Sequence, residues 1–372
     1  MGFIEDCAQP VSFQSGAKSQ STSQTAGVGG VTQYTTATEN FNFGSGQTSG
    51  AVDILIVDDN SGSMEQDQQH LADGFNNFIS DLSGVDWQIG ITTTDVCADT
   101  DYSCRGGGAS FPPARGRFIG PADQSSTTPF STQYILRPNT PNVATAFAQT
   151  IQRTTSSGQY LIGSGDERGI YAANLTVNGT NDPNVAQGFF RQNAGLAIVI
   201  LSNEDERSCG NDPTCHNDPT NASQYEPFEP DDYPTSLVNN IKSTFGAAKN
   251  FAVHAIIIKP GDIACFDTEH VDAGDYGDTY ATLVQATGGI LASLCDGGTG
   301  QYAQDLSSIS QMIRNTAQPV INLNHTPTET PSLTFNPPTN ITFTWAPGST
   351  QITLSAYPTN TTVSVTYVYS DN

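Results

Sequence analysis

A few short, largely apolar runs constrain the fold of this chain most. The runs at 51–57, 196–201 and 251–258 have the length of strands, and the first is followed by a polar turn and then by Leu71 and Phe75 at helical spacing. Apolar runs of this kind are typical of parallel strands that are buried on both faces. No run approaches the ~18 residues that a membrane-spanning helix needs. We therefore predict an α/β fold with a doubly wound, mostly parallel, Rossmann-like sheet and no transmembrane segment.

The hydrophobic period changes along the chain and indicates three regions. Residues 1–50 are rich in Ser, Thr, Gln and Gly, which favours a polar segment with one short strand at the alternating Phe41 and Phe43. The helical period extends over 51–316, the predicted α/β domain. Residues 317–372 alternate with period two between Pro, Gly and Asn turns, which predicts a small antiparallel, β-sandwich-like domain.

The charge balance and the motif content exclude several functions. Thirteen Lys and Arg against 37 Asp and Glu give a net charge of −24, which argues against binding of nucleic acid or anionic lipid, since both need clustered cations. The five histidines form no HExxH motif and no recognisable pairing with Ser or Cys, and there is no P-loop or dinucleotide fingerprint. We expect a protein without enzymatic activity.

Cysteine spacing indicates an oxidising compartment. Two pairs bracket short polar loops and a third pair follows apolar strand-like runs; the pairs are Cys97 and Cys104, Cys209 and Cys215, and Cys265 and Cys295. Such brackets favour disulfides over free thiols, and neither loop has the CxxC-type spacing of a zinc site. The start of the chain has no basic residue and no apolar stretch of a signal peptide. We expect an extracellular or cell-surface protein from which a signal or lipid-anchor sequence was removed; if the cell is Gram-negative, the expected location is the periplasm or outer membrane.

The turn after the first apolar run carries the candidate chemistry. Asp59, Ser61 and Ser63 occupy alternate positions there, at the carboxyl end of a predicted strand, which is where open α/β sheets bind ligands. Their oxygens can converge on one point, and hard oxygen ligands suit Mg²⁺, with Mn²⁺ or Ca²⁺ as alternatives. A purely structural alternative is that Ser63 caps the following helix while Asp59 and Ser61 form an Asx turn.

Three segments in this order, 52–64, 163–169 and 197–206, resemble the metal-site loops of von Willebrand factor type A domains, in particular those of bacterial surface proteins. The resemblance extends over the predicted α/β domain and implies a metal-ion-dependent adhesion site. The last residues of the chain also look like the tail of those bacterial proteins.

By this resemblance, Ser61 and Ser63 bind the metal directly, and Asp59 binds it directly or through water. In the second loop many relatives use Thr, and Glu167 here matches the Glu of integrin β-type loops, with Ser164 and Asp166 as weaker candidates. The alternative is that Asp166 and Glu167 are ordinary acids at a helix N-terminus, which the helix dipole favours.

The third loop departs from the family pattern, because Asn203 stands where the usual Asp lies. A neutral oxygen there would weaken metal affinity and strengthen the pull of the metal on an external carboxylate. Asp205 or Glu204 could take over through a shift of the loop. The alternative is that residues 204–206 are simply solvated charge.

The resemblance also implies a partner, a protein or glycan with a carboxylate that completes the coordination of the metal. The leading hypothesis is a secreted or surface-anchored adhesin; the alternative is an envelope scaffold with a degenerate metal site, which Asn203 favours. Two loops, 97–117 and 204–233, are expected to select the partner unless they are solvated insertions without a ligand. Their candidate contact residues are Arg105, Arg115, Arg117, Tyr225 and Phe228.

Overall fold

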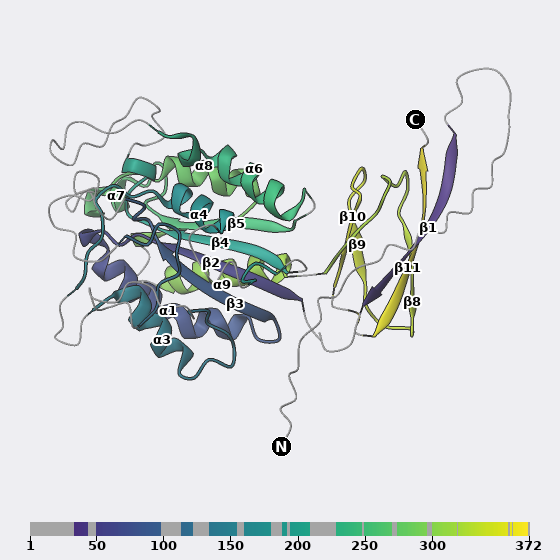
Figure 1. Ribbon diagram of the computed structural model, residues 1–372, viewed down its shortest axis with the longest axis horizontal. Helices are drawn as coiled ribbons and strands as arrows, with labels where there is room; N and C mark the ends of the chain where they lie inside the picture. The colour runs from purple at the N-terminus through teal and green to yellow at the C-terminus, as the bar shows by residue number, and fades with distance from the viewer. Residues whose placement is uncertain are drawn as a thin grey trace. The chain divides into compact units, whose positions relative to one another are not determined.

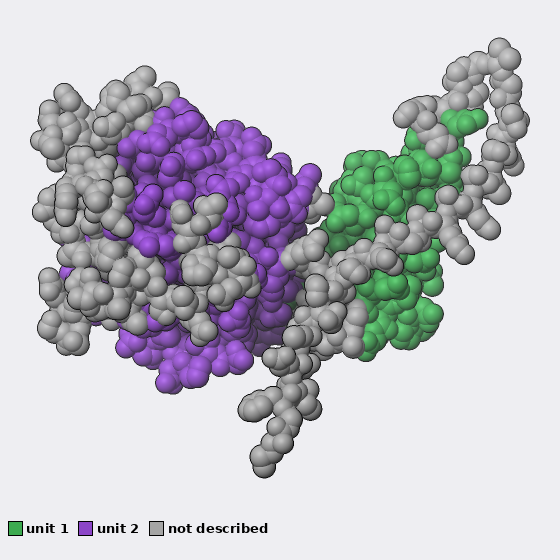
Figure 2. Space-filling view, viewed as in Figure 1, with its two compact units in different colours: residues 1–50, 318–372 green, residues 51–317 purple. Residues whose placement is uncertain are grey.

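The structure, a computed structural model, divides into two compact units (Figure 2). The α/β unit is Ala51–Ala317, and the β unit combines Met1–Gly50 with Gln318–Asn372. The structure describes residues 33–43, 50–97, 113–121, 134–154, 160–179, 188–191, 194–208, 228–247, 249–269, 274–295, 300–317, 319–355, 358 and 360–370.

Five parallel strands form the sheet of the α/β unit, in the order β3-β2-β4-β5-β6. Almost every side chain of the three central strands is buried, as expected for a parallel sheet that is covered on both faces. The strands are β2 (Ala51–Asp58), β3 (Asp86–Thr93), β4 (Gly195–Leu201), β5 (Phe251–Ile257) and β6 (Leu291–Ser293).

Helices cover both faces of this sheet, with α6 and α8 above it and α1 and α3 below it in Figure 1. One face packs against α1, α3 and α9, and the other against α4, α6 and α8, so the predicted doubly wound fold is confirmed. Within the described residues, no helix is long and apolar enough to span a membrane. The helices are α1 (Glu65–Asp81), α3 (Val143–Gln152), α4 (Gly169–Asn178), α6 (Pro234–Phe245), α7 (Ile263–Glu269), α8 (Asp278–Thr287) and α9 (Gly300–Thr316).

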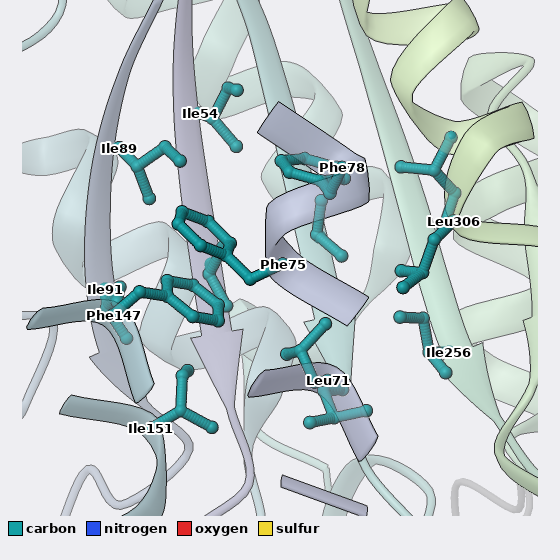
Figure 3. Close-up of a cluster of buried hydrophobic side chains, with 14 of the residues drawn as sticks. Ile54, Leu71, Phe75, Phe78, Ile89, Ile91, Phe147, Ile151, Ile256 and Leu306 are labelled. Carbon is teal, nitrogen blue, oxygen red and sulfur yellow. The ribbon is translucent and has the colours of Figure 1, made fainter. Parts of the chain in front are cut away.

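Alternate side chains of each strand enter opposite cores. In β2, Ile54 belongs to the core beneath α1 and α9, whereas Leu55 belongs to the core beneath α4 and α8. Figure 3 shows the first core, where the rings of Phe75 and Phe147 stack with their centroids 3.7 Å apart. Burial on both faces fixes the register of the strands, and hence the place of the loops that leave their ends.

The strand order creates a switch point between β2 and β4. The chain leaves β2 through α1 and reaches β3 on one side, whereas β4 lies on the other side of β2. Loops that leave the carboxyl ends of these two strands therefore run to opposite faces and open a crevice, where such sheets bind ligands. Asp59 follows β2 there, and Ser202 follows β4.

The β unit contains two three-stranded antiparallel sheets, β1-β11-β8 and β7-β10-β9, around an apolar core. Its first strand was only partly predicted: a short strand at Phe41 and Phe43 was expected in a separate N-terminal segment, but β1 has ten residues. It pairs with β11 from Tyr34 opposite Ser370 to Phe43 opposite Thr361. The strands are β1 (Tyr34–Phe43), β7 (Val320–Asn322), β8 (Ser332–Asn336), β9 (Phe343–Trp345), β10 (Gln351–Leu354) and β11 (Thr361–Ser370).

One predicted disulfide is present in full. Cys265 in α7 is bonded to Cys295 just after β6, with an S–S distance of 2.06 Å and a Cα–Cα distance of 5.4 Å. Cys97 is also disulfide-bonded. The predictions for Cys104, Cys209 and Cys215 lie outside the described residues.

Candidate metal site

The first loop is a tight turn that two hydrogen bonds fix against the end of β4. The backbone N–H of Asp59 donates to the carbonyl of Leu201 over 2.9 Å, and the hydroxyl of Ser202 donates to Asp59 Oδ2 over 2.7 Å. The other carboxyl oxygen, Oδ1, accepts the N–H of Ser61 over 2.8 Å, which closes the expected Asx turn. Asp59 is fully buried, and burial raises its pKa.

The predicted structural role of Ser63 as a helix cap is wrong. Ser63 lies inside the 3₁₀ turn Gly62–Met64, and the N-cap of α1 is Met64. Neither the 3₁₀ turn nor α1 has a side-chain capping hydrogen bond at its N-terminus. The two hydroxyls of this turn face each other instead, with Ser61 Oγ 3.0 Å from Ser63 Oγ. Both serines are therefore available for a role other than capping.

The third loop brings an amide oxygen to this pair. The hydroxyl of Ser63 donates to Asn203 Oδ1 over 3.2 Å. Asn203 is fully buried, its N–H donates to Met64 Sδ and its carbonyl accepts the N–H of Asp275, whereas its Nδ2 has no partner. Its backbone is fixed, so its side-chain oxygen is presented to the first loop.

These oxygens fit a small divalent cation. Neighbouring ligands in an octahedral Mg²⁺ site with bonds of ~2.1 Å lie ~3.0 Å apart, close to the 3.0 and 3.2 Å that join Ser61, Ser63 and Asn203. Ser63 is partly exposed while Ser61 and Asn203 are buried, so the group is open on one side. Over the described part of the chain, no group of three or more His, Cys, Asp or Glu is arranged around a metal. A cation here would depend on hydroxyl and amide oxygens as much as on carboxylates.

The second loop is held against the first loop and against the end of β3. The N–H of Gly163 donates to the carbonyl of Asn60 over 2.6 Å, and the N–H of Ser164 donates to Asp95 Oδ2 over 3.1 Å. A Cβ on Gly163 would lie 1.9 Å from Asn60 Nδ2. Only glycine allows this approach of the two loops.

Glu167 lies at the end of the second loop and is fully buried. Neither of its carboxyl oxygens receives a hydrogen bond. Burial raises its pKa well above the usual range, and the neighbouring acids Glu204 and Asp59 raise it further. A buried carboxyl group without donors is costly, and such a group in a cleft is a candidate ligand for a cation.

The other acids of these loops are engaged elsewhere. Asp166 forms a bidentate ion pair with Arg207 (Nε to Oδ1 3.1 Å, Nη2 to Oδ2 2.9 Å). Asp205 accepts the N–H of Thr279 over 3.0 Å and its hydroxyl over 2.8 Å, and burial raises the pKa of Asp205 to about 7. Both oxygens of Asp205 therefore serve the start of α8, whereas Asn203 contacts Ser63 of the first loop.

One alternative interpretation of these acids is overturned. Residues 204–206 are buried, so they are not solvated charge. Glu206 accepts the N–H groups of Ile170 and Tyr171 over 2.8 and 3.1 Å, so an acid of the third loop also serves the N-terminus of α4.

The residues predicted for partner binding are only partly brought to a surface. Arg115 is exposed, and its N–H donates to the carbonyl of Asp95. The guanidinium of Arg117 donates to backbone carbonyls of its own loop, at Pro113 and Ala114. The ring of Phe228 lies edge-on to that of Tyr233, with centroids 5.5 Å apart. Arg105 and Tyr225 lie outside the described residues.

Sequence reasoning missed three buried arginines around the site. Arg153 pairs with Asp58, directly before the first loop, and Arg168 forms a bidentate ion pair with Asp232. Arg207 pairs with Asp166. One signal was present in the sequence. The chain has only 13 Lys and Arg against 37 Asp and Glu, so an Arg within an acidic loop was a candidate for a buried ion pair.

The chain matches no protein-family model and no curated protein. Similar solved structures include the pilus adhesin SpaC from Lactobacillus rhamnosus GG (11% identity, TM-score 0.33, covering 96% of this chain and 42% of that one). A von Willebrand factor type A protein from Catenulispora acidiphila has 13% identity and a TM-score of 0.35, covering 98% of this chain and 66% of that one. The pilus adhesin RrgA from Streptococcus pneumoniae has 10% identity and a TM-score of 0.31, covering 90% of this chain and 58% of that one. The chain thus spans less than half of the length of SpaC. The strand order gives Ala51–Ala317 the doubly wound, parallel α/β fold that the sequence predicted.

Proposed function

We propose that the α/β unit binds a divalent cation, Mg²⁺ by preference, at the carboxyl edge of its sheet. The direct ligands are the hydroxyls of Ser61 and Ser63 and the amide oxygen of Asn203, with Asp59 bound directly or through water. Glu167 supplies the second-loop carboxylate. The observation that carries this proposal is the set of separations between the three neutral oxygens, 3.0 and 3.2 Å, since they match an edge of an octahedral Mg²⁺ shell.

The cation would hold an oxygen of a partner, and we propose that the chain is an adhesin at the cell surface. A bound dication acts as a Lewis acid toward an external oxygen. The side chain of Ser63 is partly exposed, which leaves room for that oxygen on the solvent side. Asn203 adds no negative charge, so the cation keeps more of its attraction for an acidic group on a protein or glycan. The proposal includes no chemical reaction.

An envelope scaffold with a degenerate metal site is the second candidate. Asn203 in place of an acid and the use of Asp205 to cap α8 both favour it. The two candidates differ in one measurable property, because a scaffold of this kind needs no cation at the three loops.

Calorimetric titration with Mg²⁺, and Mn²⁺ titration followed by the electron paramagnetic resonance signal of free Mn²⁺, distinguish these candidates. We expect one site in the wild type, and at least tenfold weaker binding in Asp59→Ala and Ser63→Ala. The matched control is Ser80→Ala, at an exposed serine of α1. A wild type that neither releases heat nor removes free Mn²⁺ would leave the scaffold as the better account.

The partner is sought on an array of proteins and glycans probed with and without EDTA. The adhesin proposal requires spots that the wild type binds in Mg²⁺, that EDTA removes and that Ser63→Ala fails to bind. Binding that survives both EDTA and the substitution contradicts a metal-mediated contact.

A further inference from the structure

Arg207 holds Glu167 from two directions. Its backbone N–H donates to the carbonyl of Glu167 over 2.7 Å. Its guanidinium forms the bidentate pair with Asp166, the residue directly before Glu167. Arg207, directly after the third loop, therefore fixes both the peptide carbonyl of Glu167 and its chain neighbour Asp166.

The backbone of Arg207 is strained. Its φ and ψ are 58° and 25°, in the left-handed region that disfavours side chains other than Gly and Asn. Its side chain is only 6% exposed, although arginine is seldom buried. Strain and buried charge at one position persist only where the surrounding structure enforces them, and they concentrate at functional sites.

A second clamp acts on the other side of Glu167. Arg168 donates to both carboxyl oxygens of Asp232, from Nε over 2.8 Å and from Nη2 over 2.9 Å. Its N–H also donates to the carbonyl of Thr94 at the end of β3. Glu167 thus lies between two bidentate ion pairs that reach different segments of the chain.

Stability alone is a weak reason for this arrangement. Buried ion pairs are often worth no more than apolar residues of the same size, because both charges lose their water. Here the two pairs keep a carboxyl group in place that receives no hydrogen bond. A glutamate free to move would turn its carboxylate toward solvent or a donor, so the clamps work against that relaxation.

We propose that Arg207 is a positioning residue of the metal site, which holds the carboxylate of Glu167 where the cation binds. This inference rests on the proposed function, because it requires a cation at the three loops. It assigns to Arg207 a role that neither its charge nor its place in the sequence reveals. Partners that orient a metal ligand typically change metal affinity 10- to 100-fold when they are removed.

The test compares Arg207→Gly with the wild type, since glycine adopts the left-handed backbone without strain and only the side chain is lost. We expect the Mn²⁺ dissociation constant, measured from the signal of free Mn²⁺, to rise at least tenfold. The matched control is Arg191→Gly, which removes an arginine paired with the buried Asp53 in the first half of β2, away from the three loops. Its Mn²⁺ affinity stays within about twofold of the wild type, although it too loses an ion pair.

A second variant separates positioning from stability. Arg207→Gly leaves Asp166 without its ion pair, whereas Arg207→Gly combined with Asp166→Asn removes both charges and recovers part of the lost stability. A positioning role predicts that the double variant regains thermal stability but not Mn²⁺ affinity. If affinity returns together with stability, Arg207 is only a structural residue and the inference is wrong.

A third measurement needs no metal. In the metal-free wild type the N–H of Arg207 is held by Glu167, and we expect slow hydrogen exchange there that becomes faster in Arg207→Gly. If the wild type does not bind Mn²⁺, the proposed function is wrong. If the wild type binds Mn²⁺ and Arg207→Gly binds it equally well, only the role of Arg207 is wrong. Should Arg207→Gly fail to fold, Arg207→Lys takes its place, because it keeps the charge but loses the bidentate geometry. Its Mn²⁺ dissociation constant should also rise.

Discussion

Ser63 Oγ lies 3.2 Å from Asn203 Oδ1, although 140 residues separate them in the sequence. The contact exists because β2 and β4 are neighbours in the sheet and both loops leave the same edge. It also places an uncharged amide of the third loop beside the hydroxyl of Ser63. In the site that we propose, the charge of this one residue would set both how strongly the cation binds and how strongly the cation attracts a partner.

Asn203→Asp is expected to raise the affinity for Mg²⁺ about tenfold, because an anionic oxygen replaces a neutral one at the same position. Without metal the variant should be less stable than the wild type, since the new carboxylate would lie at a fully buried position. The increase in melting temperature on adding Mg²⁺ should therefore be larger in the variant. Calorimetric titration and thermal unfolding with and without EDTA measure both effects.

The control for the added charge is Asn76→Asp, on the exposed side of α1. It should change neither the affinity for Mg²⁺ nor the size of the metal-induced stabilisation. Equal metal affinity in Asn203→Asp and the wild type would mean that the third loop does not contribute a ligand.

Gly163→Ala is expected to separate the first two loops. The new Cβ would lie 1.9 Å from Asn60 Nδ2, in a contact that is buried, so we expect a loss of about 1–3 kcal/mol in the free energy of unfolding. Gly163→Ala should cost much less when it is combined with Asn60→Ala, because the side chain that collides with the new Cβ is then absent. Urea unfolding of the two single variants and of the double variant measures the coupling.

Gly165→Ala is the matched control, since a Cβ there would meet nothing within 4 Å. It lies two residues further along the same loop and should leave the free energy of unfolding within about 0.5 kcal/mol of the wild type. Additive losses in Asn60→Ala and Gly163→Ala would contradict the close approach of the two loops.

Local patterns in the sequence were sufficient for the sheet and for part of the site. The strand, turn and helix from Ala51 to Asp81 follow from one apolar run and one helical period, and Ser61 and Ser63 lie in a single turn. The ion pairs could not be predicted, because they join residues far apart without any periodic signal: 41 residues separate Asp166 from Arg207. The same holds for β1, which pairs with a strand more than 300 residues later.

The metal-free protein is expected to lose stability as the pH rises from about 4 to about 8. Asp67 in α1 is buried, and burial, followed by the charges of Glu269 and Asp59, raises its pKa to about 7. In the unfolded chain the carboxyl group is ionised above about pH 4. The folded state therefore holds one more proton between these values, which stabilises it at low pH, and this contribution is lost as the pH passes through about 7.

Asp67→Asn removes this group from the titration. Urea unfolding in EDTA at pH 5 and pH 8 should show a smaller difference in the free energy of unfolding than in the wild type, by on the order of 2 kcal/mol. The same substitution at Asp73, an exposed acid of the same helix, controls for net charge. Identical differences in the wild type and Asp67→Asn would refute the raised pKa.

Glu39 of β1 is expected to stabilise the β unit without affecting the metal site. Its buried carboxyl group accepts hydrogen bonds from the hydroxyl of Tyr367 and from the N–H and Nδ2 of Asn324, the last two over 3.0 and 2.9 Å. In Glu39→Gln one of the two carboxylate oxygens is replaced by an NH2 group, which cannot accept a hydrogen bond. We expect hydrogen exchange in β11 to report a loss of about 1–3 kcal/mol.

The control is Thr38→Ala on the exposed face of the same strand, which removes only the hydrogen bond between Thr38 and Thr366 and should cost less than about 1 kcal/mol. Tyr367→Phe combined with Glu39→Gln should cost less than the sum of the two single substitutions, because both remove the same hydrogen bond. The Mn²⁺ affinity of all these variants should equal that of the wild type, since Glu39 belongs to the other compact unit. A Glu39→Gln variant with weakened Mn²⁺ binding would show instead that the two units are energetically coupled.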